Sequence, residues 1–298
     1  MSRIETIAIL THLRQGLDQD YNLARCKTFF WEREGRRVLV HQGTRDPPAA
    51  DVAILHVDLT VVPPDYLAMA ARYDRCINGA VADISKRRIS RWLVTRDDAY
   101  DGAVLVKHDR NHGGASERRL RIAEGGLFVR LQEAALRWLP RAWHGRAGGD
   151  YQLFQRKEQV PAWVWRRRDL VVERFFAERH GDGYALHQWH FLGPCSAVST
   201  FVSPSPLVKW HSGVLRLPPH HRVPEALWRR RRELGMDFGK LDFIVPDGEA
   251  VLLDANPTPH VGTREVHERS LWFCGVMAAG IDGIAEAAST LRAGGSTA

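Results

Sequence analysis

The chain has 298 residues, 44% of them hydrophobic and 26% charged, which is ordinary for a protein that folds around a buried core. Its first residues lack the apolar stretch of a signal peptide, and no window reaches the roughly 20 apolar residues of a membrane span, so we expect a cytoplasmic protein without a membrane anchor. The formal net charge of +7 suits a polyanionic partner, either nucleic acid or the phosphates of a nucleotide.

The first third of the sequence alternates short apolar runs with helical segments. The apolar runs are residues 7–10, 37–40 and 52–57, and the helical patterns cover residues 14–32 and 64–73. Strands that alternate with helices favour a small parallel sheet with helices packed on it. No glycine-rich phosphate fingerprint follows the first strand, so an NAD-type Rossmann domain is not expected.

The middle of the chain starts after a break near residues 75–79. A basic helix at residues 84–88 is followed by a strand that ends at Lys107 and by a polar loop that contains Gly113 and Gly114. Residues 127–168 are dense in tryptophan and arginine, with a strand at 151–155. Further strands are predicted at 170–176 and 184–191, and a closing helix at 266–280. The four cysteines are scattered without CxxC spacing, so we expect reduced thiols and no zinc site.

A hairpin with three oxygen-bearing side chains is predicted around the turn at residues 246–248. Asp242 interrupts the first apolar run, Asp254 ends the second, and Asn256 points to the same side as Asp254 because side chains alternate along a strand. Side chains on neighbouring antiparallel strands can converge, and Mg²⁺ takes oxygen ligands. The residues alone leave two interpretations open: a magnesium site, or a surface hairpin with solvated acids and an Asx turn at Asn256-Pro257.

The surrounding sequence favours the first interpretation. The stretch DFGKLDF at residues 237–243, followed by LLDANPTP at 252–259, resembles the metal-binding signature of the ATP-grasp superfamily, which includes D-alanine–D-alanine ligase and glutathione synthetase. The whole chain is also similar to bacterial ATP-grasp proteins that share both stretches. The resemblance implies ATP and Mg²⁺ (or Mn²⁺) as cofactors, with Asp242, Asp254 and Asn256 as metal ligands. Asp254 departs from the pattern, because many members have Glu there.

The resemblance also implies an α/β fold with three parts. These are a small N-terminal parallel α/β domain at residues 1–80, a central ATP-grasp subdomain at 81–170 and a C-terminal ATP-grasp subdomain at 171–298. ATP is expected to be sandwiched between the two α+β subdomains, under a glycine-bearing phosphate loop.

The nucleotide-binding residues implied by the resemblance come from both subdomains. Lys86, Lys107 and the loop with Gly113 and Gly114 would contact the phosphates. Glu173 and the backbone near Phe175 would contact the adenine, and Glu178 the ribose. Lys86 and the further candidate Lys209 each have an alternative interpretation as a solvated lysine on a helix or strand edge, and Glu173 could instead pair with Arg174. Several family members have a lysine at the position of Arg174, so this chain departs from the pattern at that contact with ATP.

The activity implied is carboxylate–amine ligation. A carboxylate attacks the terminal phosphate of ATP to form an acyl phosphate, and an amine then displaces phosphate. Lys209, Lys240 and Arg264 are the candidate catalytic residues, for offsetting phosphate charge, holding the acceptor carboxylate or stabilising the tetrahedral intermediate. The expected partners are ATP and small-molecule or peptide substrates. An ATP-grasp kinase and a nucleotide-binding module without turnover are the alternatives.

Two arginine runs, 166–168 and 229–232, raise a nucleic-acid alternative. The second run lies in a predicted helix, whose 3.6-residue period spreads consecutive arginines around it. One or two are therefore expected to point inward to the site, and the rest to form a solvated face. The neighbouring tryptophans fit core packing better than base stacking. His187 and His190 alternate with Trp189 and are interpreted as structural. Nucleic acid is therefore not expected as a partner, and a homodimer is the expected assembly.

Overall fold

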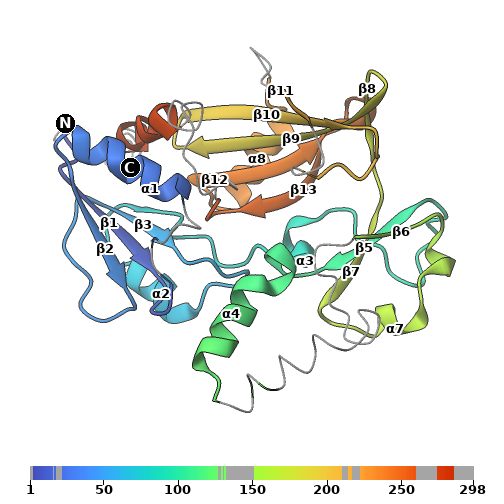
Figure 1. Cartoon of the computed structure of the whole chain (residues 1–298), viewed down its shortest axis with the longest axis horizontal. Helices are drawn as coiled ribbons and strands as arrows, with labels where there is room; N and C mark the ends of the chain where they lie inside the picture. The colour runs from blue at the N-terminus through green and yellow to red at the C-terminus, as the bar shows by residue number, and fades with distance from the viewer. Residues whose placement is uncertain are drawn as a thin grey trace, which may run out of the picture. The chain divides into compact units, whose positions relative to one another are not determined.

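The computed structural model describes residues 3–15, 17, 22–126, 129, 131, 151–209, 214–216, 222–259 and 274–284 (Figure 1). By its internal contacts the chain divides into two compact units. Unit 1 comprises Met1–Asp58, Val62–Ala82 and Glu178–Ala298, and unit 2 comprises Leu59–Val61 and Asp83–Ala177. The division into three domains at residues 80 and 170 stays a prediction.

The first sheet of unit 1 is parallel, as the alternating pattern predicts. Its strand order is β2-β1-β3-β4, with β1 at Thr6–Thr11, β2 at Arg37–Gln42, β3 at Val52–His56 and β4 at Cys76–Ile77. Strands β1 and β3 are almost wholly buried, as expected where both faces of a parallel sheet are covered. Helix α1 (Asn22–Arg33) packs against β2, and α2 (Pro64–Ala70) against β3.

The predicted first helix begins later than expected. Residues 12–15 form a turn in which the Gln15 N–H donates to the His12 carbonyl, and the Gln15 side chain bonds the backbone N–H and C=O of Asp58. These side-chain contacts hold the segment after β1 against the end of β3. Local helix propensity therefore does not decide its conformation.

The second sheet of unit 1 is antiparallel and has six strands, ordered β11-β10-β9-β12-β13, with β8 also paired to β9. Its strands are β8 (Glu178–His180), β9 (Gly183–Leu192), β10 (Cys195–Ser203), β11 (Val214–Arg216), β12 (Phe238–Ile244) and β13 (Val251–Asn256). The turn η4 (Pro246–Gly248) joins β12 to β13, which confirms the predicted hairpin.

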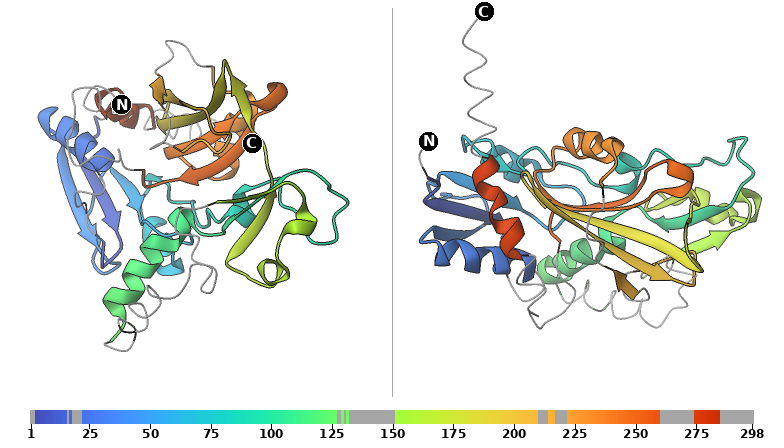
Figure 2. Two further views of the ribbon diagram at one scale, coloured as in Figure 1. Left: turned by 45° about the vertical axis from the view of Figure 1, so that its right-hand side comes forward. Right: turned by 90° about the horizontal axis from the view of Figure 1, so that it is seen from above.

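Helix α8 (Glu225–Glu233) covers one face of this sheet (Figure 2). The ring centroid of Trp228 lies 4.5 Å from that of Trp189 on β9. The Arg231 side chain is buried against the same rings and donates to the carbonyls of Met236, Gly193 and Asp237. Arg231 therefore points into the protein, but on the face of the sheet opposite the hairpin carboxylates and not, as was expected of one or two arginines of the run, towards the candidate site. Since side chains alternate along β9 and β12, the other face carries the even-numbered residues.

The two sheets of unit 1 share one core with the last described segment. Residues 274–284 are helical apart from a turn at 279, and their apolar side chains pack with those of Trp31, Ile54, Leu192 and Phe238. The Trp31 indole N–H donates to the Ala278 carbonyl at 3.0 Å. The rest of the predicted closing helix, residues 266–273, lies outside the described residues.

Unit 2 is built on a three-stranded antiparallel sheet, ordered β6-β5-β7. The strands are β5 (Val104–His108), β6 (Gln152–Phe154) and β7 (Leu170–Arg174). The helical elements are α3 (Lys86–Ile89), η2 (Asn111–Gly114), α4 (Ala115–Glu124), η3 (Lys157–Gln159) and α7 (Ala162–Trp165). No helix in the described parts of the chain is long and apolar enough to cross a membrane.

Candidate functional site

The acidic side chains of the β12–β13 hairpin in unit 1 lie on one face of the sheet. Asp242 is directly opposite Asp254, and Lys240 is directly opposite Asn256. Opposed residues of an antiparallel pair share a face, as do residues two apart on one strand, so the four side chains form a continuous group. This is the face of the sheet that α8 does not cover. The predicted convergence of Asp242, Asp254 and Asn256 therefore has the register that it requires.

Gly239 allows β13 to approach closely beside this group. Its φ is +154°, and a Cβ at this position would lie 2.7 Å from the carbonyl oxygen of Asn256. Any other residue would push Asn256 away from Lys240. This contact explains the glycine in the DFGKLDF stretch.

Lys240 is engaged with the aspartate beside it. Its Nζ lies 2.9 Å from Asp242 Oδ1 and 3.0 Å from Asp242 Oδ2, and both side chains are 15% exposed. The ammonium group thus neutralises one of the two carboxylates on this face. The predicted roles for Lys240, holding an acceptor carboxylate or stabilising an intermediate, would require this ion pair to open.

Asn256 is held by an Asx turn. Its Oδ1 accepts the Thr258 N–H at 2.9 Å and the Thr258 hydroxyl at 3.2 Å. Thr258 Oγ1 also lies 2.9 Å from Asp58 Oδ1, which ties the hairpin to the end of β3. The two open interpretations of the hairpin are therefore combined: the Asx turn exists, and its amide lies on the face that carries both aspartates.

The sheet adds two polar residues to this face. On β9, Gln188 lies opposite Asp242 of β12, and His190 lies opposite Lys240. The side chains of Gln188 and His190 are buried. Burial, with the nearby charges of Lys240 and Lys27, holds the pKa of His190 well below its usual range, so the imidazole is neutral at pH 7. Neither residue is among the predicted site residues. The alternation of polar residues with Trp189 shows from the sequence that Gln188 and His190 share a face, but it does not show that this is the face of Asp242 and Asp254.

Glu178 lies on the opposite face. It pairs with Ala185 in the sheet, its carboxylate contacts His187 Nε2 at 3.0 Å, and it accepts the Val245 N–H at 2.6 Å. Burial opposes ionisation of Glu178, but the hydrogen bonds from His187 and Val245 outweigh it and lower its pKa. The structure thus does not bring Glu178 together with Asp242 and Asp254, and its predicted contact with a ribose would require it to leave these partners.

Lys209 and Arg264 complete the predicted catalytic set. Lys209 is half-buried in the segment after β10. Arg264 lies outside the described residues.

Unit 2 contains a buried ion pair at the predicted nucleotide site. Lys107 Nζ lies 2.6 Å from Glu173 Oε2, and the two residues are 3% and 5% exposed. Lys107 is at the end of β5 and Glu173 is on the neighbouring strand β7, diagonally across the ladder. Glu173 Oε1 is buried and has no hydrogen-bond partner among the described residues. A buried carboxylate oxygen of this kind can accept a hydrogen bond from a bound ligand.

The alternative pairing of Glu173 with Arg174 does not occur. Arg174 is exposed and stacks on Trp92 and Tyr100, with its guanidinium carbon 4.7 Å from the Tyr100 ring centroid. The Phe175 N–H donates to the Ala103 carbonyl at 2.9 Å. If adenine pairs with this strand, it therefore uses another backbone group than the Phe175 amide N–H.

The predicted glycine loop is a tight turn that leads into a helix. His112, Gly113 and Gly114 have φ angles of +47°, +62° and +74°, and α4 starts at Ala115. Two of these three left-handed positions are glycines, the residue that adopts this conformation most easily. The polar loop expected around these glycines ends at Gly114, because residues from Ala115 on are helical. Lys86, in α3, is buried, and its N–H donates to the Asp109 carbonyl.

The donor chemistry of the hairpin fits magnesium. Two carboxylates and one amide oxygen suit a hard cation that is usually bound through one or two carboxylates and substrate phosphates. Within the described ranges, no group of three or more His, Cys, Asp and Glu side chains is placed to hold a metal. Asp242 and Asp254 would therefore hold the ion with help from Asn256 and from phosphates.

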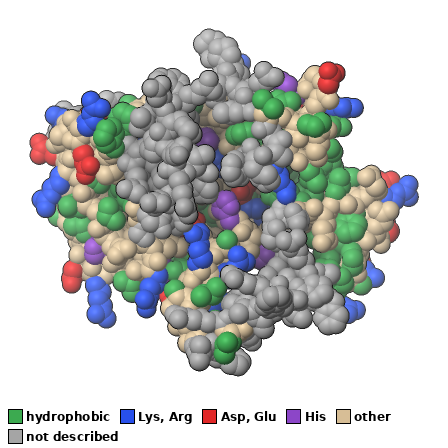
Figure 3. Space-filling view, viewed as in Figure 1, with side chains coloured by type: hydrophobic (Ala, Val, Ile, Leu, Met, Phe, Trp, Pro, Cys, Tyr) green, Lys and Arg blue, Asp and Glu red, His purple; other side chains and the backbone are tan. Residues whose placement is uncertain are grey.

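The described basic side chains on the visible face do not gather in one patch. Lys and Arg side chains are scattered there and interrupted by other types (Figure 3). In the second arginine run, Arg230 pairs with Glu233 and Arg232 with Glu225.

The chain has the ATP-grasp fold. The structure of D-alanine–D-alanine ligase from Bacillus anthracis matches it with a TM-score of 0.50 over 97% of this chain and 99% of that chain, at 9% sequence identity. The same enzyme complexed with ATP matches with a TM-score of 0.50 over 97% and 98%, at 10% identity. No protein-family model and no curated protein matches the sequence.

Proposed function

We propose that this protein is an ATP- and magnesium-dependent carboxylate–amine ligase. The observation that carries the proposal is the register of the β12–β13 hairpin, which puts Asp242 directly opposite Asp254 with Asn256 on the same face. Magnesium bound there would neutralise and orient the phosphates of ATP. The hairpin belongs to a chain with the fold of a ligase whose structure holds ATP.

The buried pair in unit 2 supports the nucleotide part of the proposal. The ammonium group of Lys107 would offset the negative charge of a phosphate, and Glu173 Oε1 would accept a hydrogen bond from the adenine amino group. Lys86 and the turn at Gly113 and Gly114 are further candidates for phosphate contacts.

The chemistry asked of the protein is mainly alignment and charge stabilisation. A substrate carboxylate oxygen bonds to the terminal phosphorus while the bond to the bridging oxygen breaks and ADP leaves. The amine nitrogen then bonds to the acyl carbon, phosphate leaves with its electron pair, and the amine loses a proton. Lys240 and Lys209 are the described lysines of unit 1 proposed to stabilise the charges that develop.

A trapping experiment tests the reaction type. The protein is incubated with ATP, Mg²⁺, hydroxylamine and a panel of amino acids and dicarboxylates, and ADP and hydroxamate are measured together. We expect one or more carboxylates to give hydroxamate in proportion to ADP, because hydroxylamine intercepts an acyl phosphate. A phosphorylated product that hydroxylamine leaves intact would establish the kinase alternative instead.

A further inference from the structure

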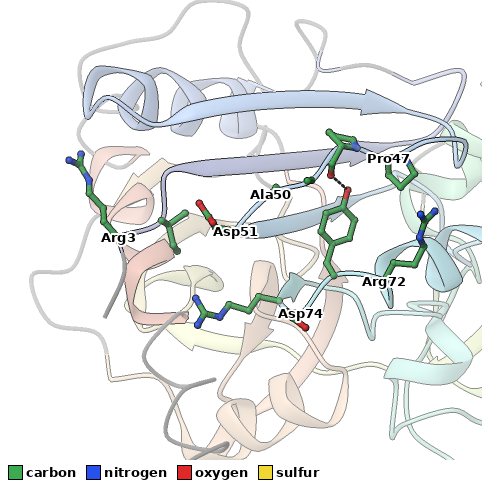
Figure 4. Close-up of a pocket in the computed structure, with 11 residues that line it drawn as sticks. Arg3, Pro47, Ala50, Asp51, Arg72 and Asp74 are labelled. Atoms are coloured by element: carbon green, nitrogen blue, oxygen red, sulfur yellow. Dashed lines mark hydrogen bonds between the residues drawn. The ribbon is translucent and has the colours of Figure 1, made fainter.

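An open cavity of about 620 Å³ lies in unit 1 (Figure 4). Its walls come from three segments that precede strands of the parallel sheet: residues 3–4 before β1, 47–51 before β3 and 72–75 before β4. All three strands run in the same direction, so the cavity is at the edge where they begin.

This position separates the cavity from the hairpin site. Asp51 precedes β3 and lines the cavity, whereas Asp58 follows β3 and contacts Thr258 of the hairpin. The two positions are seven residues apart along the chain, which at the rise of a strand is roughly 20 Å. A ligand in the cavity would therefore be a different molecule from the ATP of the proposed function.

The cavity has more positive than negative side chains. Arg3, Arg72 and Arg75 line it, against Asp51 and Asp74. Figure 4 shows Arg3 and Arg72 towards opposite ends of the cavity, with Asp51 between them. Arg3 donates to the Glu34 carbonyl. Among the described residues, the guanidinium groups of Arg72 and Arg75 make no hydrogen bond and no ion pair within 4.0 Å.

The acidic residue at the centre of the cavity is already used by the fold. Asp51 Oδ2 accepts the N–H groups of Thr6 and Glu5, each at 2.8 Å. These hydrogen bonds, the one from Thr6 first, lower the pKa of Asp51 in spite of partial burial. The carboxylate thus fixes the start of β1. The charge of Arg75 also lowers the pKa of Asp51, so Arg75 is attracted to this carboxylate without forming a hydrogen bond to it.

The wall between the arginines is fixed before any ligand binds. The Tyr73 hydroxyl donates to the Pro48 carbonyl at 2.7 Å and ties the segment after α2 to the segment before β3. The cavity lining is mostly polar, and residues 47–50, Pro-Pro-Ala-Ala, contribute apolar side chains to it. Most ligand sites combine a preformed, partly apolar wall with a few placed polar groups, and volumes of 300–1,000 Å³ are usual.

We propose that this cavity binds a small organic anion through Arg72 and Arg75. Guanidinium groups bind phosphate and carboxylate groups with paired hydrogen bonds, and the Pro-Ala wall would contact the carbon skeleton. The shared chemistry is an oxyanion on a compact molecule, supplied by either a phosphate ester or a polycarboxylate.

Calorimetric titration of the full chain with pyrophosphate and, separately, with citrate at constant ionic strength tests the proposal. The test variant is Arg72→Ala/Arg75→Ala, and the matched control is Arg33→Ala/Arg45→Ala, which removes the same charge from exposed positions outside the cavity. We expect at least one anion to bind wild type and the control equally, and to bind the test variant at least tenfold more weakly. Binding of pyrophosphate alone identifies a phosphate site, and binding of citrate alone a carboxylate site.

Three outcomes would overturn the proposal. In the first, neither anion binds wild type. In the second, both variants lose affinity equally, which means that net charge is responsible. In the third, the test variant binds as wild type does, which means that the anion binds elsewhere. Circular dichroism checks the fold of each variant. If the double variant is unfolded, Arg72→Glu alone replaces it, because this side chain is exposed and the expected loss is the same. Failure of this test leaves the ligase proposal untouched, since no cavity residue belongs to it.

Discussion

At the scale of single residues, the most consequential interaction is the ion pair between Lys107 and Glu173. Two charges with side chains only 4% and 7% exposed are stable together because each compensates the other, and removing one leaves an uncompensated buried charge. We expect Lys107→Met to lower the free energy of unfolding by about 3–5 kcal/mol. Urea denaturation followed by circular dichroism measures the change.

The double variant Lys107→Met/Glu173→Leu is the control for that prediction. It removes both charges, so most of the lost stability should return. If the single and the double variant are equally destabilised, packing rather than charge accounts for the loss.

A second residue-scale prediction concerns the buried His56. Burial is the main cause that lowers the pKa of His56 to about 4, with the charge of Lys27 acting in the same direction and Asp58 opposing it. The unfolded chain takes up a proton near pH 6.5 and the folded chain does not, so stability falls as the pH drops from 6.5 towards 4.

Between pH 6.5 and pH 5 this difference amounts to about 2 kcal/mol. Urea unfolding of wild type and His56→Gln at both pH values checks it. The variant should lose about 2 kcal/mol less than wild type over this interval. An identical pH dependence in the two proteins would mean that His56 is protonated in the folded state.

The residue types of the acidic group were readable from the sequence, but the contacts were not. Asp242, Asp254 and Asn256 stand out because polar oxygens interrupt apolar runs. By contrast, Glu178 faces His187 because β8 pairs with β9, and Gln188 and His190 join the face of Asp242 and Asp254 because β9 pairs with β12. Strand register depends on partners far away in the chain, so it is not a local property of these residues.

At the scale of elements, a buried asparagine ties the parallel sheet to the β12–β13 hairpin. Asn78 has a φ of +59° and is 1% exposed. Its Oδ1 accepts the N–H groups of Asp237 and Phe238 at 3.0 and 3.1 Å, and its Nδ2 donates to the Phe238 carbonyl at 2.9 Å. The side chain thereby fixes where β12 begins.

We expect Asn78→Ala to cost about 3 kcal/mol of stability, because buried backbone groups lose their partners. Asn78→Gly loses the same hydrogen bonds but tolerates the positive φ, so it should be about 1 kcal/mol more stable than the alanine variant. Thermal or urea unfolding of both variants checks the prediction. An alanine variant as stable as wild type would show that water replaces the side chain.

Elements with strong periodicity were predicted correctly, and elements set by tertiary contacts were not. The buried runs of β1 and β3 and the hairpin follow from pattern alone, whereas the face on which Arg231 is buried does not. Helix α4 was missed because Ala115–Glu124 is largely polar, with Ser116 and Leu120 as its buried residues. The start of α1 was misplaced because Gln15 bonds to the Asp58 backbone.

At the scale of the whole molecule, residues from both ends of the chain meet in unit 1. Arg36 donates to Asp282 with two hydrogen bonds of 2.9 and 2.7 Å across 246 residues of sequence. The Arg36 side chain is 6% exposed, while that of Asp282 is 52% exposed. The hydrogen bond from Arg36 is the main cause that lowers the pKa of Asp282, so this contribution is present at neutral pH and is lost in acid.

Because Asp282 is half exposed and screened by water, we expect Asp282→Asn to cost only about 1 kcal/mol at pH 7. Urea unfolding measures it, with Asp46→Asn as the control. Asp46 is exposed and has a positive φ that asparagine adopts readily, so this variant should equal wild type. Equal stability of Asp282→Asn and the control would mean that the shared apolar core alone holds the last helix.

The central claim is that the hairpin holds magnesium against ATP, and calorimetry with a non-hydrolysable ATP analogue tests it most directly. Wild type, Asp254→Asn and Asp247→Asn are titrated with and without Mg²⁺. Asp247 is the matched control, since it lies in the turn of the same hairpin, exposed and with a φ of +51°. We predict magnesium-dependent binding that wild type and Asp247→Asn share and that Asp254→Asn loses. Equal, magnesium-dependent binding by all three proteins would contradict the claim.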